Sequence, residues 1–298
     1  MSREQIRRLV EDHVGDRGMV DIGVEGVGLF RVGESVRCSP AVYEPTLVAV
    51  VSGAKEVIMD GTSYVYDRSR YLCCALSMPV EAGTPTASPD DPLVGVQIAL
   101  DPRVMSELSR EIDVAPGAVR ERRSGALPPG WALARWDDEF TEALLRLVQL
   151  ADRPADAAVL GEGRLREVYY ALLKGEAGPA ARRAFGMGNE IARVIERVSA
   201  HLDEPVTIDD MAAQVGMSRA VFHRRFKEAT AMSPLQFVKA IRLNTAAMRM
   251  AGGMTVNEAA MEVGYASASQ FSREFKRTYG QSPKQWSRTM QPLPAGVI

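Results

Sequence analysis

The feature that most constrains this chain is a repeat in its last third. Val215-Gly216 recurs 48 residues later as Val263-Gly264. Beyond those glycines the spacing is 49, and the matched pairs are Phe222 and Phe271, Arg224 and Arg273, Phe226 and Phe275, Lys227 and Lys276, and Ser233-Pro234 and Ser282-Pro283. So many matches in one order indicate a structural unit that the chain contains twice.

Each copy of the repeat predicts two short helices joined by a tight turn. In the first copy Thr207 is a good N-cap, Gly216 tolerates the left-handed conformation that ends a helix, and Ser218 caps the next helix. Phe222 and Phe226 lie four residues apart, on the inner face of that second helix. The second copy contains two capping boxes, Thr255 with Glu258 and Ser267 with Gln270. This pattern is typical of a helix-turn-helix motif.

The second helix of each unit has small, polar and basic side chains on its outer face, which suits contact with double-stranded DNA. Arg can bind guanine through two hydrogen bonds, Gln can do the same with adenine, and Lys or Arg neutralises phosphates. A solvated surface charge explains any one of these residues, but not a matched set on two helices. The expected DNA-contacting residues are Arg219, Ala220, His223, Arg224 and Lys227 in the first unit, and Ala268, Ser269, Gln270, Ser272, Arg273, Lys276 and Arg277 in the second.

Residues 233–250 predict one continuous helix between the two units. At about 1.5 Å per residue this helix spans roughly 27 Å. That length can hold two recognition helices about one turn of DNA apart, so one chain can read two adjacent major grooves.

The charge is divided unevenly along the chain. The net charge is −2, yet residues 1–188 carry 22 Lys and Arg against 28 Asp and Glu, whereas residues 189–298 carry 14 against 10. A basic C-terminal part suits an anionic partner, and the acidic N-terminal part suits a different one.

The N-terminal part predicts short strands between about residues 23 and 100. The β-rich runs of strand length occupy residues 27–32, 47–51, 56–59, 63–66 and 71–76. Asp60-Gly61 between two of them is a hairpin-turn signal, because that turn needs positive φ. About six to eight strands at this spacing favour a closed or sandwiched sheet of the jelly-roll kind.

Helices are expected around these strands, over residues 1–12, from the cap Asp101-Pro102 onward, over 131–152 and over 157–174. The expected fold class is α+β with two domains. The first is a cupin-like or jelly-roll β-barrel with flanking helices, and the second is an all-α domain of about seven helices. We place the first domain at residues 1–180, a glycine-rich linker at 181–188 and the DNA-binding domain at 189–291.

One helix of the N-terminal part has a pronounced apolar stripe at spacings of three and four residues. The stripe consists of Trp136, Phe140, Leu144, Leu147 and Ala151. Two interpretations stay open and both can hold. The stripe packs against the β-domain, or it forms the seam of a homodimer through helices 131–174.

Several classes of protein are disfavoured. The N-terminus has no signal-peptide pattern and no apolar run approaches the ~18 residues of a membrane span, so we expect a cytoplasmic protein without a membrane partner. The histidines, His13, His201 and His223, lie outside the strand region, where a cupin enzyme would need metal ligands. We therefore expect no metal, no cofactor and no enzymatic activity.

The cysteines leave one rival function open. Cys73 and Cys74 are adjacent in a predicted strand, so their side chains face opposite sides. Either one lies in the core and the other faces a cavity or solvent, or both are buried structural cysteines. Cysteine-based repair of alkylated DNA, or a thiol stress sensor, would need activated thiolates there. The candidate effector contacts are these two cysteines together with Tyr43, Tyr64 and Tyr66.

The C-terminal sequence resembles the AraC/XylS family of bacterial transcription regulators. The resemblance is carried by MAAQVGMSRAVFHRRFKEATAMSPLQFVKAIRL and by EAAMEVGYASASQFSREFKRTYGQSPKQW, about a third of the chain. It implies base-reading roles for Ala220, His223, Arg224, Ala268, Ser269, Gln270, Ser272 and Arg273. Two positions depart from the family pattern: Ala231 replaces the usual glycine, and Ala220 is too short to reach far into a groove.

The N-terminal sequence resembles the effector domains of one branch of this family. The similar text is YEPTLVAVVSGAKEV followed by DRSRYL. The resemblance implies a cupin-like barrel that binds a small molecule or mediates dimerisation. It also implies RNA polymerase as a candidate partner, while the effector itself stays unknown.

Overall fold

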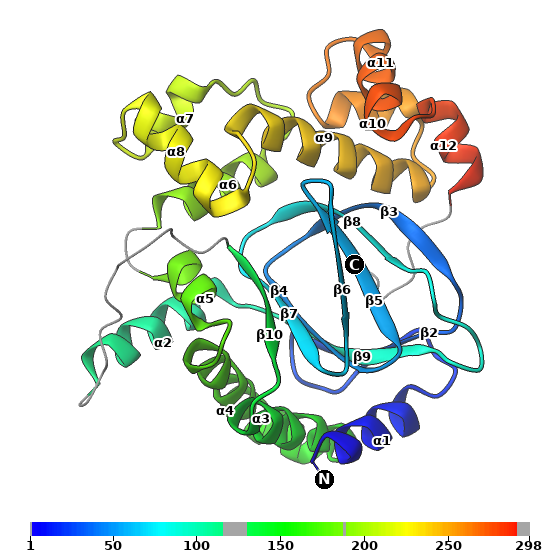
Figure 1. The fold of residues 1–298 in the computed structure, drawn as a ribbon, viewed down its shortest axis with the longest axis vertical. Helices are drawn as coiled ribbons and strands as arrows, with labels where there is room; N and C mark the ends of the chain where they lie inside the picture. The colour runs from blue at the N-terminus through cyan, green and yellow to red at the C-terminus, as the bar shows by residue number, and fades with distance from the viewer. Residues whose placement is uncertain (1, 116–129, 187–188, 291–298) are drawn as a thin grey trace.

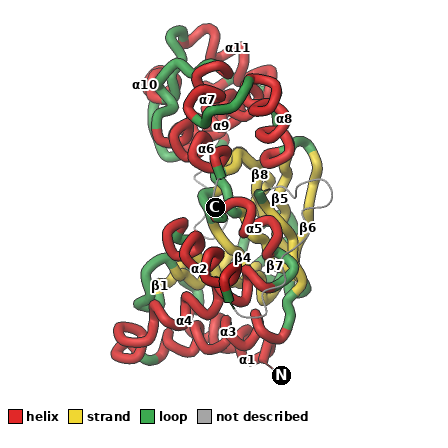
Figure 2. The backbone as a smooth tube through the Cα atoms, turned by 90° about the vertical axis from the view of Figure 1, so that its left-hand side faces the viewer, coloured by secondary structure: helices red, strands yellow, loops and turns green. Residues whose placement is uncertain are grey.

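The computed structural model describes residues 2–115, 130–186 and 189–290. Strands make up the middle of the molecule, a group of helices lies at one end, and helices α1, α3 and α4 lie at the other (Figure 1, Figure 2). The α+β fold class with a helical C-terminal domain is thereby confirmed.

The strands form two antiparallel sheets. The six-stranded sheet has the order β1-β2-β9-β4-β7-β10, and the four-stranded sheet has the order β3-β8-β5-β6. The strands are β1 (Met19–Asp21), β2 (Val27–Val32), β3 (Val36–Tyr43), β4 (Thr46–Ser52), β5 (Ala54–Met59), β6 (Thr62–Asp67), β7 (Arg70–Cys74), β8 (Met78–Thr84), β9 (Leu93–Ala99) and β10 (Trp131–Arg135). The sequence favoured either a closed or a sandwiched sheet, and the structure has two separate sheets.

The hairpin signal is confirmed, and one missed strand has a physical explanation. Asp60 has φ 47° and Gly61 has φ 74°, and they join β5 to β6 with Met59 opposite Thr62. Strand β3, which contains Pro40, was not predicted from the sequence. Proline cannot donate to a ladder, but β3 is an edge strand, where one side needs no donor.

The helices of the N-terminal part are α1 (Ser2–Val14), α2 (Pro102–Val114), α3 (Asp138–Val148), a 3₁₀ turn (Gln149–Asp152), α4 (Pro154–Lys174) and α5 (Gly178–Phe185). Helix α1 buries Ile6, Val10 and Val14 and contacts β2, β4 and β9 of the six-stranded sheet. The ring of Phe140 on α3 stacks on Tyr71 of β7, with centroids 4.2 Å apart. These helices therefore cover the outer face of that sheet.

Two sequence-based boundaries were wrong. Residues 131–135 are strand β10 rather than the start of a helix, because they pair with the edge of β7, Trp131 opposite Cys74. The ring of Trp131 also packs edge-on against Tyr64 at 4.7 Å. Such long-range pairing overrides a local helical preference. The proposed linker at 181–188 begins inside helix α5. Pro179 lies in the first turn of this helix, where proline is favoured. Residues 187–188 lie outside the described part of the chain.

The apolar stripe packs inside the chain. Phe140, Leu144 and Leu147 are fully buried, and Trp136 is almost so. The interpretation of the stripe as packing against the β-domain is confirmed. As a dimer seam the stripe is unavailable, because its own sheet already covers it.

The C-terminal part consists of seven helices within the described residues. They are α6 (Glu190–Ala200), α7 (Ile208–Gln214), α8 (Arg219–Thr230), α9 (Pro234–Ala251), α10 (Val256–Glu262), α11 (Ala268–Tyr279) and α12 (Pro283–Thr289). Thr207 Oγ1 accepts from the Asp210 amide at 3.1 Å, and Thr255 with Glu258 forms a full capping box, as predicted. The predicted box of Ser267 with Gln270 forms only in part: Ser267 Oγ accepts from the Gln270 amide at 3.4 Å, but the Gln270 side chain donates to Glu274 instead. Each helix-turn-helix unit is therefore encoded locally.

Candidate nucleic-acid interface and pocket

The first unit exposes one face of α8. Phe222 and Phe226 are buried against Phe237 of α9, with ring centroids of Phe226 and Phe237 5.3 Å apart. This anchoring leaves the opposite face in solvent, where the structure places Arg219, Ala220, His223, Arg224 and Lys227, all of them exposed. Arg219 also pairs with Asp209 of α7 at 3.4 Å, which joins the two helices of the unit.

The second unit is anchored in the same way. Phe271 and Phe275 of α11 are fully buried, and the Phe275 ring packs against Trp286 of α12 at 5.7 Å. The structure exposes Ala268, Ser269, Gln270, Arg273, Lys276 and Arg277, and leaves Ser272 half-buried. Within the described part of the chain, Arg273, Lys276 and Arg277 form no ion pair, so their positive charge is available to an outside anion.

A polar network that the sequence analysis missed fixes one edge of α11. Glu274 accepts from the Tyr265 hydroxyl at 3.0 Å and from the Gln270 amide at 3.4 Å, and it pairs with Lys239 of α9 at 3.3 Å. Burial raises the pKa of Glu274, but these hydrogen bonds outweigh it and lower the pKa overall. Gln270 is therefore held by its own helix in the absence of DNA.

Helix α9 holds the two units together and docks on the β-domain (Figure 1). The side-chain amide of Asn244 donates to the carbonyls of Ala41 and Val80, both at 2.7 Å, and its oxygen accepts from the Tyr279 hydroxyl at 2.6 Å. Asn244 is buried, and this network satisfies its amide hydrogens and its oxygen. The helix that spaces the recognition helices is thus tied to strands β3 and β8.

Helix α8 has its own contacts near the N-terminal domain. The Gly130 amide donates to the Ala229 carbonyl at 2.8 Å, and Arg183 of α5 lies 3.9 Å from Glu228. Arg225 of α8 is exposed and lies 3.9 Å from Glu190 of α6. Both helix-turn-helix units are therefore attached to the rest of the chain through defined contacts.

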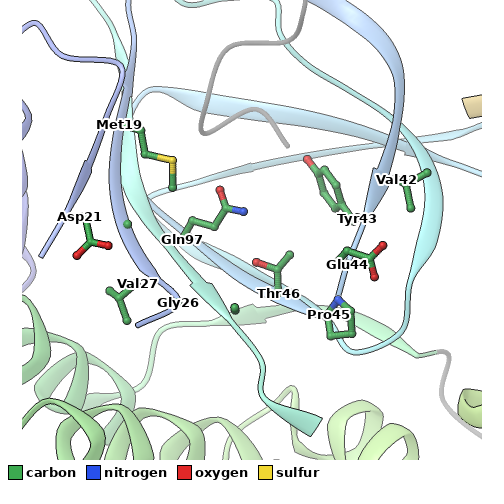
Figure 3. Close-up of a pocket in the computed structure, with 12 residues that line it drawn as sticks. Met19, Asp21, Gly26, Val27, Val42, Tyr43, Glu44, Pro45, Thr46 and Gln97 are labelled. Carbon is green, nitrogen blue, oxygen red and sulfur yellow. The ribbon is translucent and has the colours of Figure 1, made fainter. Parts of the chain in front are cut away.

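The N-terminal domain has a pocket of about 470 Å³ between the two sheets, at the end where β3 turns into β4. Its lining comes from β1, β2, β3, β4 and β9, with Tyr43 and Gln97 pointing into the same space (Figure 3). Asp21 and Glu44 lie at opposite sides of it, and Met19 covers Gly28. A small organic molecule fits such a volume.

Of the five candidate effector residues, the structure brings Tyr43 alone to this pocket. Tyr66 is fully buried and points between the sheets, whereas Tyr64 packs against Trp131. Cys73 and Cys74 are both fully buried, which confirms the interpretation as two buried structural cysteines and excludes the one in which either reaches solvent. Helix α3 packs against Tyr71 of the same strand, and β10 pairs with its edge.

The environment of the thiols opposes cysteine chemistry. Burial raises the pKa of Cys74 to about 12 and raises the pKa of Cys73 well above its usual range. Cys74 donates its hydrogen to the Leu76 carbonyl at 3.2 Å. Burial, together with the carboxylate of Glu56, raises the pKa of Cys38 to about 12. A reactive cysteine needs a lowered pKa, and these three have the reverse.

A fully buried lysine lies near the pocket and was not singled out from the sequence. Lys55 on β5 has its ammonium group 5.3 Å from the ring centroid of Tyr43 and 5.8 Å from that of Phe30. Burial lowers the pKa of Lys55 to about 7. The alternation of β5 carries the signal, since Lys55 occupies the same face as Val57 and Met59.

Two features, a metal-binding cluster and a membrane-spanning helix, are absent from the described residues. No group of three or more His, Cys, Asp or Glu side chains lies together in a way that could hold a metal ion. No helix among them is long and apolar enough to cross a membrane.

Two helix-turn-helix units on one spacer helix, joined to a two-sheet domain with a pocket, define a helix-turn-helix transcription regulator. The family described as the AraC-type transcriptional regulator N-terminus matches residues 23–180, and a helix-turn-helix domain family matches residues 211–289. The chain belongs to the AraC-type transcriptional regulators.

Relatives in sequence match the C-terminal part. The HTH-type transcriptional regulator MtrA of Neisseria gonorrhoeae is 37% identical over 103 residues, which are 34% of this chain and 33% of MtrA. The regulatory protein SoxS of Salmonella typhimurium is 30% identical over 97 residues, which are 32% of this chain and 91% of SoxS. The match thus spans about a third of the length of MtrA, and nearly all of SoxS.

The whole fold is similar to that of ToxT from Vibrio cholerae. The structure of wild-type ToxT with a bound unsaturated fatty acid superposes with a TM-score of 0.56, covering 89% of this chain and 95% of ToxT. The two sequences are 13% identical, so the likeness concerns the fold alone.

Proposed function

We propose that this protein is a sequence-specific regulator of transcription that binds double-stranded DNA through α8 and α11. The observation that carries the proposal is the matched exposure of two recognition helices, each anchored by a buried phenylalanine pair to a core that includes α9. Since α9 has 18 residues, it spans about 27 Å, close to one turn of DNA. Each chain would then contact two successive major grooves.

The proposed contacts divide into base reading and phosphate binding. Arg224 and Arg273 suit guanine and Gln270 suits adenine, since each can make two hydrogen bonds to a base edge. Lys227 and Lys276 lie toward the ends of their helices and suit phosphates. Ala220 offers only a methyl group, which can touch a thymine methyl, so we expect the second unit to read more sequence than the first.

We further propose that a small molecule bound in the N-terminal domain controls this activity. The pocket beside β3 supports a ligand site, and the docking of α9 on β3 supports communication with the DNA-binding domain. RNA polymerase and a second copy of the chain are the proposed protein partners, and the cytoplasm is the proposed location because the DNA is there. The rival thiol function is not favoured, because burial keeps the cysteines protonated.

The first test selects bound fragments of the source genome with the purified full-length protein and then footprints them. We expect a few sites, each with two protected major-groove segments roughly 10 base pairs apart. Recovery of fragments no better than non-specific DNA, at low salt and with cell extract present as a source of effector, would contradict sequence-specific regulation.

A pair of variants assigns the contacts. Replacing Arg273→Ala should weaken binding by about 1 to 3 kcal/mol and relax the base preference at one position. Arg193→Ala on α6 removes a similar exposed charge away from the recognition helices and should change binding little. Equal losses in the two variants would mean that Arg273 supplies only general charge.

A further inference from the structure

The lining of the pocket beside β3 has an unusual chemical balance. Among the described residues it contains two carboxylates, Asp21 and Glu44, and the amide of Gln97, but no Lys, Arg or His. We propose that this pocket binds a small organic cation, namely a protonated amine with a flat apolar body. This inference rests on the proposed function, in which a small molecule bound in the N-terminal domain is the effector.

The two carboxylates keep their negative charge uncompensated. Asp21 accepts from the Gly23 amide at 2.5 Å, and Glu44 accepts from the Ser77 hydroxyl at 2.5 Å. Across the part of the chain that the structure describes, neither carboxylate forms an ion pair with a basic side chain. Two such charges beside a partly enclosed space attract a cation and repel an anion.

Two other polar side chains of the pocket, Gln97 and Thr46, can accept a hydrogen bond from a ligand. The Oε1 atom of Gln97 is buried and has no donor among the described residues. The hydroxyl of Thr46 already donates to the Ile98 carbonyl at 3.1 Å, so its oxygen can only accept a further hydrogen bond. A buried acceptor without a donor is destabilising, and an ammonium N–H would satisfy it.

The apolar walls fit a flat body. The thioether of Met19, with Val42 and Pro45, supplies apolar lining, whereas the ring of Tyr43 is fully buried (Figure 3). Gly28 brings the backbone close beneath Met19, where a Cβ atom would collide with the Met19 methyl group. A thioether packs well against a flat conjugated group.

Lys55 is a basic group whose ammonium lies 5.3 Å from the ring centroid of Tyr43, and it is not among the described residues that line the pocket. Its charge would oppose a cation in the pocket. Burial lowers the pKa of Lys55 to about 7, so this opposition weakens above neutral pH, while an ordinary amine ligand keeps its proton.

Occupancy of the pocket has a direct route to α9. Val42 and Tyr43 line the pocket from the same strand whose Ala41 carbonyl accepts from Asn244. The Val42 amide also lies 3.2 Å from the sulfur of Met248 on α9. A ligand that moves this end of β3 therefore moves the docking site of the spacer helix.

The test is calorimetric titration of the full-length protein near pH 8 with three probes of similar size: tryptamine, tryptophol and indoleacetate. These carry a cation, a neutral hydroxyl and an anion on the same ring system. We expect tryptamine to bind at least about tenfold more tightly than the other two. Glu44→Gln and Asp21→Asn should each weaken tryptamine about fivefold, whereas Glu25→Gln, at an exposed site outside the lining, should not.

Three results would overturn the proposal. These are equal or tighter binding of tryptophol or indoleacetate, no saturable heat from tryptamine at concentrations on the order of 10 mM, and an equal loss in Glu25→Gln and Glu44→Gln. Binding to selected DNA is measured on the same preparations without probe. A failure of DNA recognition is therefore separate from a failure of the cation site.

Discussion

Single residues set both the stability and the pH response of the N-terminal domain. Lys55 is the clearest case, because full burial of its amine favours the neutral form. The unfolded chain binds a proton at this lysine up to about pH 10.5, whereas the folded chain releases it near pH 7. Stability contributed by this group is therefore low below pH 7 and rises as the pH increases.

We predict that the free energy of unfolding rises by about 2 kcal/mol between pH 7 and 8.5, and that Lys55→Met abolishes this rise. The window ends there because the raised pKa values of the three cysteines act in the opposite direction above about pH 9. Urea unfolding at several pH values measures the difference between the two proteins. A parallel pH dependence in Lys55→Met would show that Lys55 is not the group responsible.

The residue after α8 carries a backbone cost. Ala231 has φ 65°, while the equivalent residue after α11 is Gly280 with φ 75°. Only glycine adopts this left-handed conformation without a steric penalty, which for other residues is roughly 1 to 2 kcal/mol.

We predict that Ala231→Gly stabilises the protein by about 1 kcal/mol and that Gly280→Ala destabilises it by a similar amount. A Cβ at Gly280 would meet no atom within 4 Å, so its cost is purely conformational. Chemical denaturation of both variants against the parent protein checks the pair. Destabilisation by Ala231→Gly would mean that packing of the alanine methyl outweighs the backbone term.

At the level of elements, α9 has two roles at once. It fixes the distance between the recognition helices, and it docks on β3 and β8 through Asn244. Its C-terminal half also supports α12, because the Trp286 indole donates to the Ala247 carbonyl at 3.3 Å. A change in the β-domain can reach both DNA-reading units through this one helix.

We predict that Asn244→Ala destabilises the protein by about 2 to 3 kcal/mol and alters its DNA affinity. The cause is the loss of donors to the carbonyls of Ala41 and Val80 at a buried position. Thermal unfolding and a DNA-binding titration measure the two effects. Asn257→Ala on the exposed side of α10 is the control, and equal behaviour of the two variants would contradict a special role for Asn244.

For the whole molecule, the open question is association with a second copy. The apolar stripe of α3 is buried inside the chain, so a dimer through the 131–174 region requires another surface of that region. Helix α4 exposes Val159 at 81% and Leu160 at 44%, and these are the apolar side chains that solvent reaches there together with Tyr170. They support a dimer through the outer side of α4.

We predict that the protein sediments as a dimer at micromolar concentration and that Val159→Asp shifts it to monomer, because a charge would be buried at the contact. Gln149→Glu adds a charge at an exposed site of the 3₁₀ turn and should leave the dimer intact. Sedimentation of the parent protein as a monomer, with and without DNA, would rule out this dimer.

The helix-turn-helix units could be predicted from the amino-acid sequence, because their signals act over three or four residues. Thr255 and Glu258 bond each other across one turn of helix, and Asp60-Gly61 encodes the β5–β6 hairpin in two residues. The buried phenylalanines follow from helical spacing. The exposed faces that carry the DNA-contact candidates follow from the same pattern.

The other features could not be predicted in this way, because they depend on contacts between segments that are distant in the sequence. Residues 131–135 became a strand through pairing with β7, and both cysteines of β7 are buried in a sheet where β4 and β10, from before and after it in the chain, flank that strand. The pocket joins Asp21, Glu44 and Gln97 from separate strands and turns, and no local pattern aligns them. Asn244 shows no polar partner within its helix, and its carbonyl acceptors lie more than 160 residues away.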